Sequence, residues 1–277
     1  MTKIKLFSHL FHRNKQNDNV ISEQQRAQLA QIGLQFPEIL SFRKMLDQIL
    51  AGASIARFGD GEFALAMGKD IPFQKGNSML AKRLNEILLQ PSDDKLLICI
   101  PSFKLTPPLP DFQKYISWWE KYWLNNWTTL SKIFVNKWYG NALFSREYIF
   151  PEIPIIDIKK IWDNLDVVFV VPLNGRFVYD QRLFGNIKSK IEINVPPQNA
   201  FDEYERILNE CLAQSKDKLF FISAGPTATV LAADLSAHGY HALDMGHFPN
   251  AYHKYLDEAP LPEYTPMVRE DGKKRVK

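Results

Sequence analysis

Short apolar runs alternate along the chain with stretches in which apolar residues recur at helical spacing. The apolar runs, each of a length suited to a buried strand, are 54–58, 95–100, 166–171, 191–195 and 219–223, with a final one that begins at His241. The helix-like stretches are 22–32, 37–51, 77–89, 111–133, 156–165, 200–213 and 226–237. Strands that alternate with helices are typical of a parallel sheet with helices on its faces. The pattern therefore predicts an α/β protein with a mostly parallel sheet.

The most informative stretch runs from Ser54 to Gly68 and predicts a strand, a tight loop and a helix. The loop, Gly59-Asp60-Gly61-Glu62, is expected at the carboxyl end of the strand, where open α/β sheets bind their ligands. Its glycines allow a sharp turn, so the carboxylates of Asp60 and Glu62 can meet one hard cation such as Mg²⁺ or Mn²⁺. The alternative is ordinary turn chemistry, in which Asp60 caps the following helix and Glu62 favours its positive end.

A second informative unit follows the strand 219–223. Gly225 and Pro226 begin a helix, and the free amides of a helix start form an anion site of the kind that holds nucleotide phosphates. The hydroxyls of Thr227 and Thr229 lie close by in the sequence. The spacing of the glycines is not that of a dinucleotide fingerprint, so this unit predicts a phosphate site without naming the nucleotide.

Two arginines are placed to bind an anion. Arg146, in the loop-like segment 138–148, could clamp a phosphate through its planar guanidinium group, or it could simply pair with the neighbouring Glu147. Arg176 lies just beyond the carboxyl end of the strand 166–171, which is the edge at which ligands bind.

Two further polar residues have both a structural and a functional interpretation. Asn199 precedes a helix with acidic residues in its first turn, so it is interpreted first as an N-cap and second as a ligand contact. His247 follows Gly246 at the end of the last strand. It is either a structural histidine or a metal ligand or acid–base group.

Composition narrows the classes of function. Of the 277 residues, 45% are hydrophobic and 23% charged, which is typical of a globular protein with a sizeable core. The formal net charge is only +3, so the chain lacks the strong positive field of a nucleic-acid-binding protein, and no nucleic-acid partner is expected. Cys99 and Cys211 lie in a strand-like and a helix-like run, which favours reduced thiols in the core of a cytosolic protein.

Both ends of the chain are basic. Residues 1–35 carry Ile4, Phe7 and Leu10 at helical spacing among basic residues, so this segment either lies on an anionic membrane surface or is a frayed terminus. Residues 36–260 are expected to form the main domain and 261–277 a solvated basic tail. We find no membrane-spanning run and no signal peptide, so the expected location is the cytoplasm, with at most peripheral contact with the inner face of the cytoplasmic membrane.

Six short motifs follow one another in order. They are Arg57-Phe-Gly-Asp-Gly-Glu62; Asn141 with Ser145-Arg146; Arg176 before Leu183-Phe184; Asn199-Ala-Phe-Asp-Glu-Tyr204; Gly225-Pro-Thr-Ala-Thr229 with Asp234-Leu235; and Asp244-Met-Gly-His247. Together they resemble the bacterial glycosyltransferase family of the GT-D fold, once catalogued only as a domain of unknown function. The similarity extends from Ile39 to Tyr252.

This resemblance implies a Rossmann-like sheet and the transfer of a sugar from a nucleotide-sugar donor, commonly a UDP-sugar, to a glycan or glycoconjugate. It also implies a divalent metal, Mn²⁺ or Mg²⁺, on the Asp60 and Glu62 pair. His247 would complete the metal shell or deprotonate the acceptor. The residues expected to bind the donor are Arg57, Gly59, Gly61, Arg146, Arg176, Asn199, Gly225, Pro226, Thr227 and Thr229.

The chain departs from the family pattern just before Arg176. A glutamate-bearing sequence is expected there, but this chain has Val171-Pro-Leu-Asn-Gly-Arg176. Two other classes of protein therefore stay open. A metal-dependent phosphohydrolase would use the same metal clamp without an acceptor. A non-catalytic nucleotide-sugar-binding or scaffold protein of a polysaccharide-assembly complex would show no metal-dependent turnover.

Overall fold

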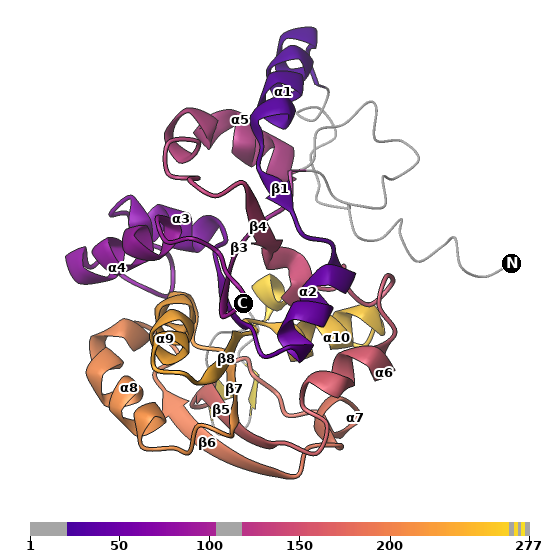
Figure 1. Ribbon diagram of the computed structural model, residues 1–277, viewed down its shortest axis with the longest axis vertical. Helices are drawn as coiled ribbons and strands as arrows, with labels where there is room; N and C mark the ends of the chain where they lie inside the picture. Colours follow the sequence, from indigo (N-terminus) through magenta and orange to yellow (C-terminus); the bar gives the residue numbers. More distant parts are fainter. Residues whose placement is uncertain (1–20, 104–117, 266–268, 271–272, 275–277) are drawn as a thin grey trace, which may run out of the picture. The chain divides into compact units, whose positions relative to one another are not determined.

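The computed structural model describes residues 21–103, 118–265, 269–270 and 273–274 (Figure 1). The described residues divide into two compact units, one made of those up to residue 36 and between 103 and 131, and the other of those between 37 and 102 and from 132 onward. Residues 1–20 of the segment considered for membrane contact lie outside the described residues. No helix in the described part is long and apolar enough to cross a membrane.

The first unit contains helices α1 (Glu23–Gln35) and α5 (Trp118–Leu130). Ser22 caps α1, because its hydroxyl accepts the backbone N–H of Gln25 at 3.2 Å and the Gln25 side chain accepts that of Ser22 at 3.0 Å. Aromatic rings fill the space between the helices, with Phe36 lying 5.0 Å from Trp123 and 5.3 Å from Trp127 between ring centroids. The aromatic residues of α5 therefore include core residues of this unit.

The second unit is built on a parallel sheet. Its strands are β1 (Glu38–Ile39), β2 (Ser54–Arg57), β3 (Leu96–Ile100), β4 (Trp138–Asn141), β5 (Asp166–Pro172), β6 (Ser189–Val195), β7 (Leu219–Ile222) and β8 (His241–Asp244). Within the described residues they form one 8-stranded sheet in the order β1-β4-β3-β2-β8-β7-β5-β6, and all neighbouring pairs are parallel. The expected α/β fold class is confirmed. A separate antiparallel pair joins β9 (Arg269–Glu270) to β10 (Lys273–Lys274).

Helices cover both faces of this sheet (Figure 1). One face carries α3 (Asp60–Ala66), α4 (Ser78–Leu88), α8 (Tyr204–Leu212) and α9 (Pro226–Ala237). The other carries α2 (Phe42–Leu50), α6 (Ile155–Ile158), α7 (Gln181–Phe184) and α10 (Phe248–Tyr255). Short 3₁₀ turns lie at η2 (Ala142–Ser145), η3 (Lys159–Ile161), η4 (Ala200–Glu203) and η5 (Pro262–Tyr264). Strands β3 and β7 are buried along their whole length, which explains why their sequences are unbroken runs of apolar residues.

Several elements differ from the sequence prediction. The expected helix 37–51 is strand β1 followed by α2, which begins later because the Ser41 hydroxyl accepts the N–H of Lys44 at 3.3 Å and caps it there. The segment 138–148, expected to be a loop, contains β4 and η2. The expected helix 156–165 is only α6 and η3.

Gly140 explains why β4 has no strand-like sequence. A Cβ atom at this position would lie 2.4 Å from the Cys99 Sγ atom and 2.9 Å from the Met45 Sδ atom. The strand therefore needs a glycine so that its backbone can approach its neighbours closely, although glycine is rare in strands.

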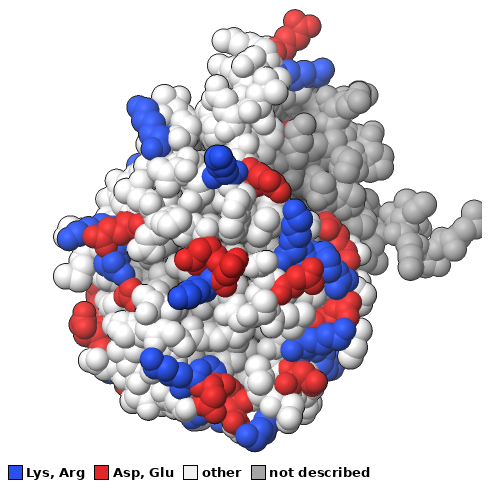
Figure 2. All heavy atoms as spheres, in the orientation of Figure 1, with Lys and Arg blue, Asp and Glu red and all other residues white. Residues whose placement is uncertain are grey.

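Charged side chains of both signs are interspersed on the face of the molecule seen in Figure 2. Among the described residues visible there, Lys and Arg lie next to Asp and Glu, and no broad area carries a single sign. Such a surface lacks the strong positive field that steers nucleic acids.

Candidate active site

Strands β2 and β8 are neighbours in the sheet, with Ile55 paired to Leu243. After β2 the chain continues into α3 on one face, whereas after β8 it continues into α10 on the other (Figure 1). Neighbouring parallel strands whose connections leave on opposite faces open a crevice at their carboxyl ends, and ligands of open α/β sheets bind there. The motifs that contain Asp60 and His247 follow these two strands directly.

A largely buried ion pair joins the ends of β2 and β8. The Nη2 atom of Arg57 lies 3.1 Å from Oδ1 of Asp244, and its Nε donates to the Asp244 carbonyl at 2.8 Å. Asp244 is only 2% exposed, and its burial raises the pKa of its carboxyl. The Thr229 hydroxyl donates to the Arg57 carbonyl at 2.8 Å. These contacts give Arg57 and Thr229 a structural role in joining β2, β8 and α9.

Gly246 lies directly against the Arg57 guanidinium group. Its φ is +47°, and a Cβ atom there would lie 2.1 Å from Nη2 of Arg57. Only glycine combines this left-handed backbone with so close an approach. The turn then places His247 at the start of α10.

The two carboxylates of the Asp-x-Glu motif lie in different surroundings. Helix α3 begins at Asp60, earlier than the expected start at Phe63, and Gly59 is its N-cap. The Oε2 atom of Glu62 accepts the Gly59 N–H at 2.7 Å. Removal from water, with Asp244 nearby, raises the pKa of Glu62 to about 7. Asp60 is therefore the first residue of α3 and not its N-cap, and Glu62 lies in the first turn, as the alternative interpretation expects.

Asp60 itself lies on the exposed first turn of α3 and forms no ion pair with the described residues. Although the residue is exposed, neighbouring atoms remove part of the water around its carboxyl, and this raises the pKa of Asp60. Glu263 contributes to the rise and Arg146 opposes it, so both of these charges lie near Asp60.

The residues suit a metal ion that is shared with a phosphorylated ligand. Among the described residues, no three His, Cys, Asp or Glu side chains are grouped so that they could hold a metal ion alone. Mg²⁺ in proteins is commonly bound by one or two carboxylates together with phosphate oxygens and water. Asp60 can supply such a carboxylate, while one oxygen of Glu62 is already occupied by Gly59. The ligand set Asp60, Glu62 and His247 stays a prediction.

His247 is half-buried among charged groups. Loss of hydration lowers the pKa of its imidazole to about 3, and the positive charges of Arg146 and Arg176 contribute to the fall. The ring is therefore neutral near pH 7, which is the form that accepts a proton or ligates a metal ion.

Replacing His247 by glutamine is expected to reduce the loss of folding stability that occurs as the pH falls below 6.5. The folded-state pKa of about 3 lies below the ordinary value of 6.5, so the unfolded chain takes up the proton first. This contribution to stability is present above pH 6.5 and is lost as the pH falls toward 3. Urea unfolding at a series of pH values, without metal, measures it. His238→Gln is the control, because His238 is an exposed residue at the end of α9. If the free energy of unfolding falls equally steeply with decreasing pH in the wild type and in His247→Gln, the lowered pKa of His247 is contradicted.

Arg146 and Arg176 are both brought to this site, but of the two only Arg146 forms ion pairs with the described residues. Arg146 lies 3.2 Å from Glu147 and 2.8 Å from Glu263. The Nε atom of Arg176 donates to the Thr265 carbonyl at 3.0 Å, and its two terminal nitrogens have no partner in the described part of the chain. Partial burial lowers the pKa of the Arg176 guanidinium. Arg176 is therefore the cation that is ready to receive an anion.

Glu263 was missed by the sequence analysis. It lies in the segment expected to be a solvated tail, but it pairs with Arg146, and its charge influences Asp60, Arg176 and His247. No periodic pattern surrounds it in the sequence, so only the fold reveals its place.

Gly225 is exposed just before α9, whereas the first residues of the helix, Pro226 to Thr229, are buried. Gly225 has a φ of +57°, and Pro226 occupies the first turn of α9 as expected. The Thr227 hydroxyl is buried and finds no hydrogen-bond partner within the described structure. Orphaned buried hydroxyls are uncommon in folded proteins, so this one is consistent with a ligand-binding helix start.

Asn199 lies at the N-cap position of η4, but its side chain does not cap that turn. It adopts a left-handed backbone with a φ of +52°, and its side chain makes no cap hydrogen bond. Instead its Oδ1 accepts the Lys75 N–H at 2.8 Å, and its own N–H donates to the Phe73 carbonyl at 2.8 Å. Asn199 therefore has the N-cap position that was expected, but its side chain holds the loop that lies against Gly225 through Phe73.

The architecture is that of a Rossmann-like α/β protein with its polar groups gathered at the switch point between β2 and β8. The family model "Glycosyltransferase GT-D fold" matches residues 55–263, and the chain therefore belongs to this family of glycosyltransferases. The match includes Glu263, at the edge of the expected tail.

Solved structures agree with this assignment. One, described as the highly conserved domain of unknown function 1792 with a distinct glycosyltransferase fold, has a TM-score of 0.78 at 29% identity and covers 91% of this chain and 95% of its own. Another, a new glycosyltransferase (DUF1792) from Streptococcus sanguinis, has a TM-score of 0.73 at 32% identity, with 81% and 86% covered.

Two curated proteins are also similar in sequence. The probable glycosyl transferase Gly of Streptococcus gordonii is 31% identical over 240 residues, which are 81% of this chain and 34% of that protein. Glycosyltransferase GlyD of Streptococcus pneumoniae serotype 4 is 28% identical over 226 residues, which are 78% of this chain and 27% of that protein. The chain thus spans about a third or less of the length of these relatives.

Proposed function

We propose that this protein transfers a sugar, of the hexose type, from a nucleotide-sugar donor, a UDP-sugar, to a glycan or glycoconjugate acceptor. Its place would be the synthesis of bacterial surface polysaccharide or glycoprotein. The observation that carries the proposal is the grouping at one switch point of three features: the exposed Asp60, the uncharged His247 and the unpaired end of Arg176. Membership of the GT-D family supports it.

Each of these groups suits a different part of the reaction. The Arg176 guanidinium can bind a diphosphate oxygen through its two terminal nitrogens. The backbone amides at the start of α9 can share the same negative charge. His247, being neutral, can accept the proton of the acceptor hydroxyl as the new glycosidic bond forms.

A divalent metal, Mn²⁺ or Mg²⁺, would be held by Asp60 with Glu62 beside it. When bound, the metal neutralises the charge that develops on the leaving nucleoside diphosphate. The residues of the chain then bind the donor and orient the acceptor, and the arginines stabilise the leaving group as its charge grows.

Thermal unfolding with UDP tests this proposal. A ligand at about 100 times its dissociation constant adds about 2.7 kcal/mol of stability, which should raise the midpoint of the wild type by roughly 5–10 °C. We expect this rise to require Mn²⁺ and to disappear in Asp60→Ala. Asp47→Ala is the matched control, since Asp47 is an exposed aspartate on the unrelated helix α2.

Turnover of the donor then identifies the reaction. A glycosyltransferase releases UDP much faster when an acceptor glycan is present, whereas a phosphohydrolase needs no acceptor. If neither UDP nor other nucleotides with Mn²⁺ move the midpoint, the transferase proposal fails and a scaffold protein takes its place.

A further inference from the structure

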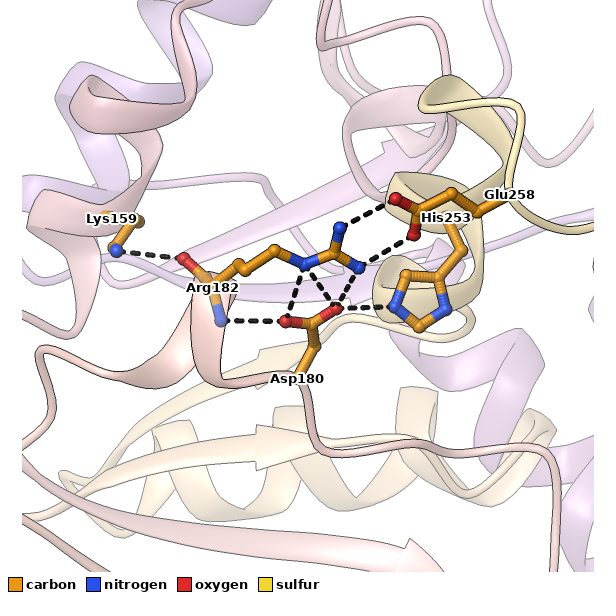
Figure 3. Close-up of polar contacts among 5 residues, drawn as sticks. All are labelled: Lys159, Asp180, Arg182, His253 and Glu258. Carbon is orange, nitrogen blue, oxygen red and sulfur yellow. Dashed lines mark hydrogen bonds and ion pairs between the residues drawn. The ribbon is translucent and has the colours of Figure 1, made fainter.

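Four side chains form a polar cluster between α7 and α10, which we call the α10 brace: Asp180, Arg182, His253 and Glu258 (Figure 3). The Nε2 atom of His253 lies 2.6 Å from Oδ2 of Asp180. Arg182 reaches the same carboxylate through Nη2 at 2.6 Å and holds Glu258 with two bonds of 2.7 and 2.8 Å. Two-pronged arginine–carboxylate contacts of this kind fix geometry as well as contributing energy.

Asp180 is the central member of the brace. Its carboxylate also accepts the backbone N–H of Arg182 at 2.7 Å and so caps the start of α7. Its side chain is 9% exposed, and that of His253 is 18% exposed. The hydrogen bonds from Arg182 hold the pKa of Asp180 well below its usual range. The low exposure of Asp180 and His253 distinguishes their contact from the exposed ion pairs of the surface, which contribute little to folding stability.

The brace joins the two segments that carry proposed site residues. The loop from Leu173 to Asp180 contains Arg176, and helix α10 begins just after His247. A further bond links the same segments, because Asn250 of α10 donates to the Arg176 carbonyl at 3.1 Å. The loop is thus attached to α10 both at Arg176 and at its end.

We propose that Asp180 is a positioning residue that fixes the Arg176 loop against α10, so that Arg176 and His247 are held toward the same ligand. The donor-binding part of this inference rests on the proposed function. Asp180 touches no substrate itself. Its effect on the donor passes through Arg176, whose main chain is held by Asn250 and whose loop ends at Asp180.

Amide hydrogen exchange without any ligand tests the structural part. In Asp180→Ala, amides of the loop and of α10 should exchange about tenfold faster than in the wild type, because local opening becomes easier. His253→Leu removes the other half of the bond and should act on the same amides. Asp166→Ala is the control, since Asp166 lies at the amino end of β5, away from the carboxyl end that leads into the Arg176 loop, and also holds a lysine, Lys188. Unchanged exchange in both brace variants would overturn the proposal.

A double-mutant cycle with UDP and Mn²⁺ tests the action through Arg176. Asp180→Ala should weaken UDP binding about tenfold in the wild-type background and less than about twofold in an Arg176→Ala background, because coupled residues are not additive. Equal losses in the two backgrounds would show a general structural effect and overturn the positioning role. If the wild type binds no UDP, the donor assignment fails, and the exchange experiment alone still decides whether the brace holds the loop.

Discussion

Replacing Asp60 by alanine is expected to lower turnover of the nucleotide-sugar donor at least about a hundredfold, the usual cost of losing one electrostatic contact to the transition state. The reason is that Asp60 is the exposed carboxylate of the site and forms no ion pair with the described residues. Its removal therefore takes away a charge without breaking an ion pair, and the hydrogen bonds that it loses are to backbone N–H groups of its own turn, Asp60 and Gly61. Turnover at saturating donor and acceptor with Mn²⁺ measures the effect.

Two further variants decide what the loss means. Asp60→Asn keeps the shape of the side chain but removes its charge, so it should lose almost as much activity as Asp60→Ala. Asp47→Ala should retain full turnover, and all three proteins should unfold within a few degrees of the wild type. Wild-type turnover in Asp60→Ala would remove Asp60 from the mechanism.

The central strands could be predicted from the sequence because they are covered on both faces. Strands β3 and β7 are entirely buried, so every position is apolar whichever way it points. The edge of the sheet is different. Strand β1 has only two residues, and β4 depends on Gly140 lying against Cys99, a contact between segments that no local pattern contains.

The location of the site could also be predicted, but not its detailed geometry. The glycine-rich loop after β2 and the helix start at Gly225 lie at the carboxyl ends of their strands, as expected from the order of elements. The hydrogen bond from the Gly59 N–H to the Glu62 carboxylate depends on where α3 begins, and helix ends are the least certain feature of any sequence-based assignment. The Arg146–Glu263 and Asp180–His253 contacts join residues that are far apart in the sequence, so only the three-dimensional fold reveals them.

Replacing Asp244 by alanine is expected to destabilise the protein by about 3–5 kcal/mol, the cost of stranding one partner of a buried ion pair. Asp244 is 2% exposed, accepts the backbone N–H of Arg57 at 3.3 Å and forms an ion pair with the Arg57 guanidinium, and its Oδ2 atom lies 3.2 Å from the Thr229 hydroxyl oxygen. Its loss leaves the Arg57 charge without a counterion. Thermal unfolding should show a midpoint lowered by roughly 10 °C.

A second substitution separates the stranded charge from the lost contacts. Adding Arg57→Met to Asp244→Ala should restore part of the stability, because the uncompensated charge is then absent and a side chain of similar length fills the space. Asp157→Ala is the control: Asp157 also pairs with two cations, Arg43 and Lys160, but on the surface, so its midpoint should hardly move. If Asp244→Ala unfolds like Asp157→Ala, then the Arg57–Asp244 pair does not hold β2 to β8. The carboxyl edge that carries Asp60 and His247 would then be fixed by packing of the apolar strands alone.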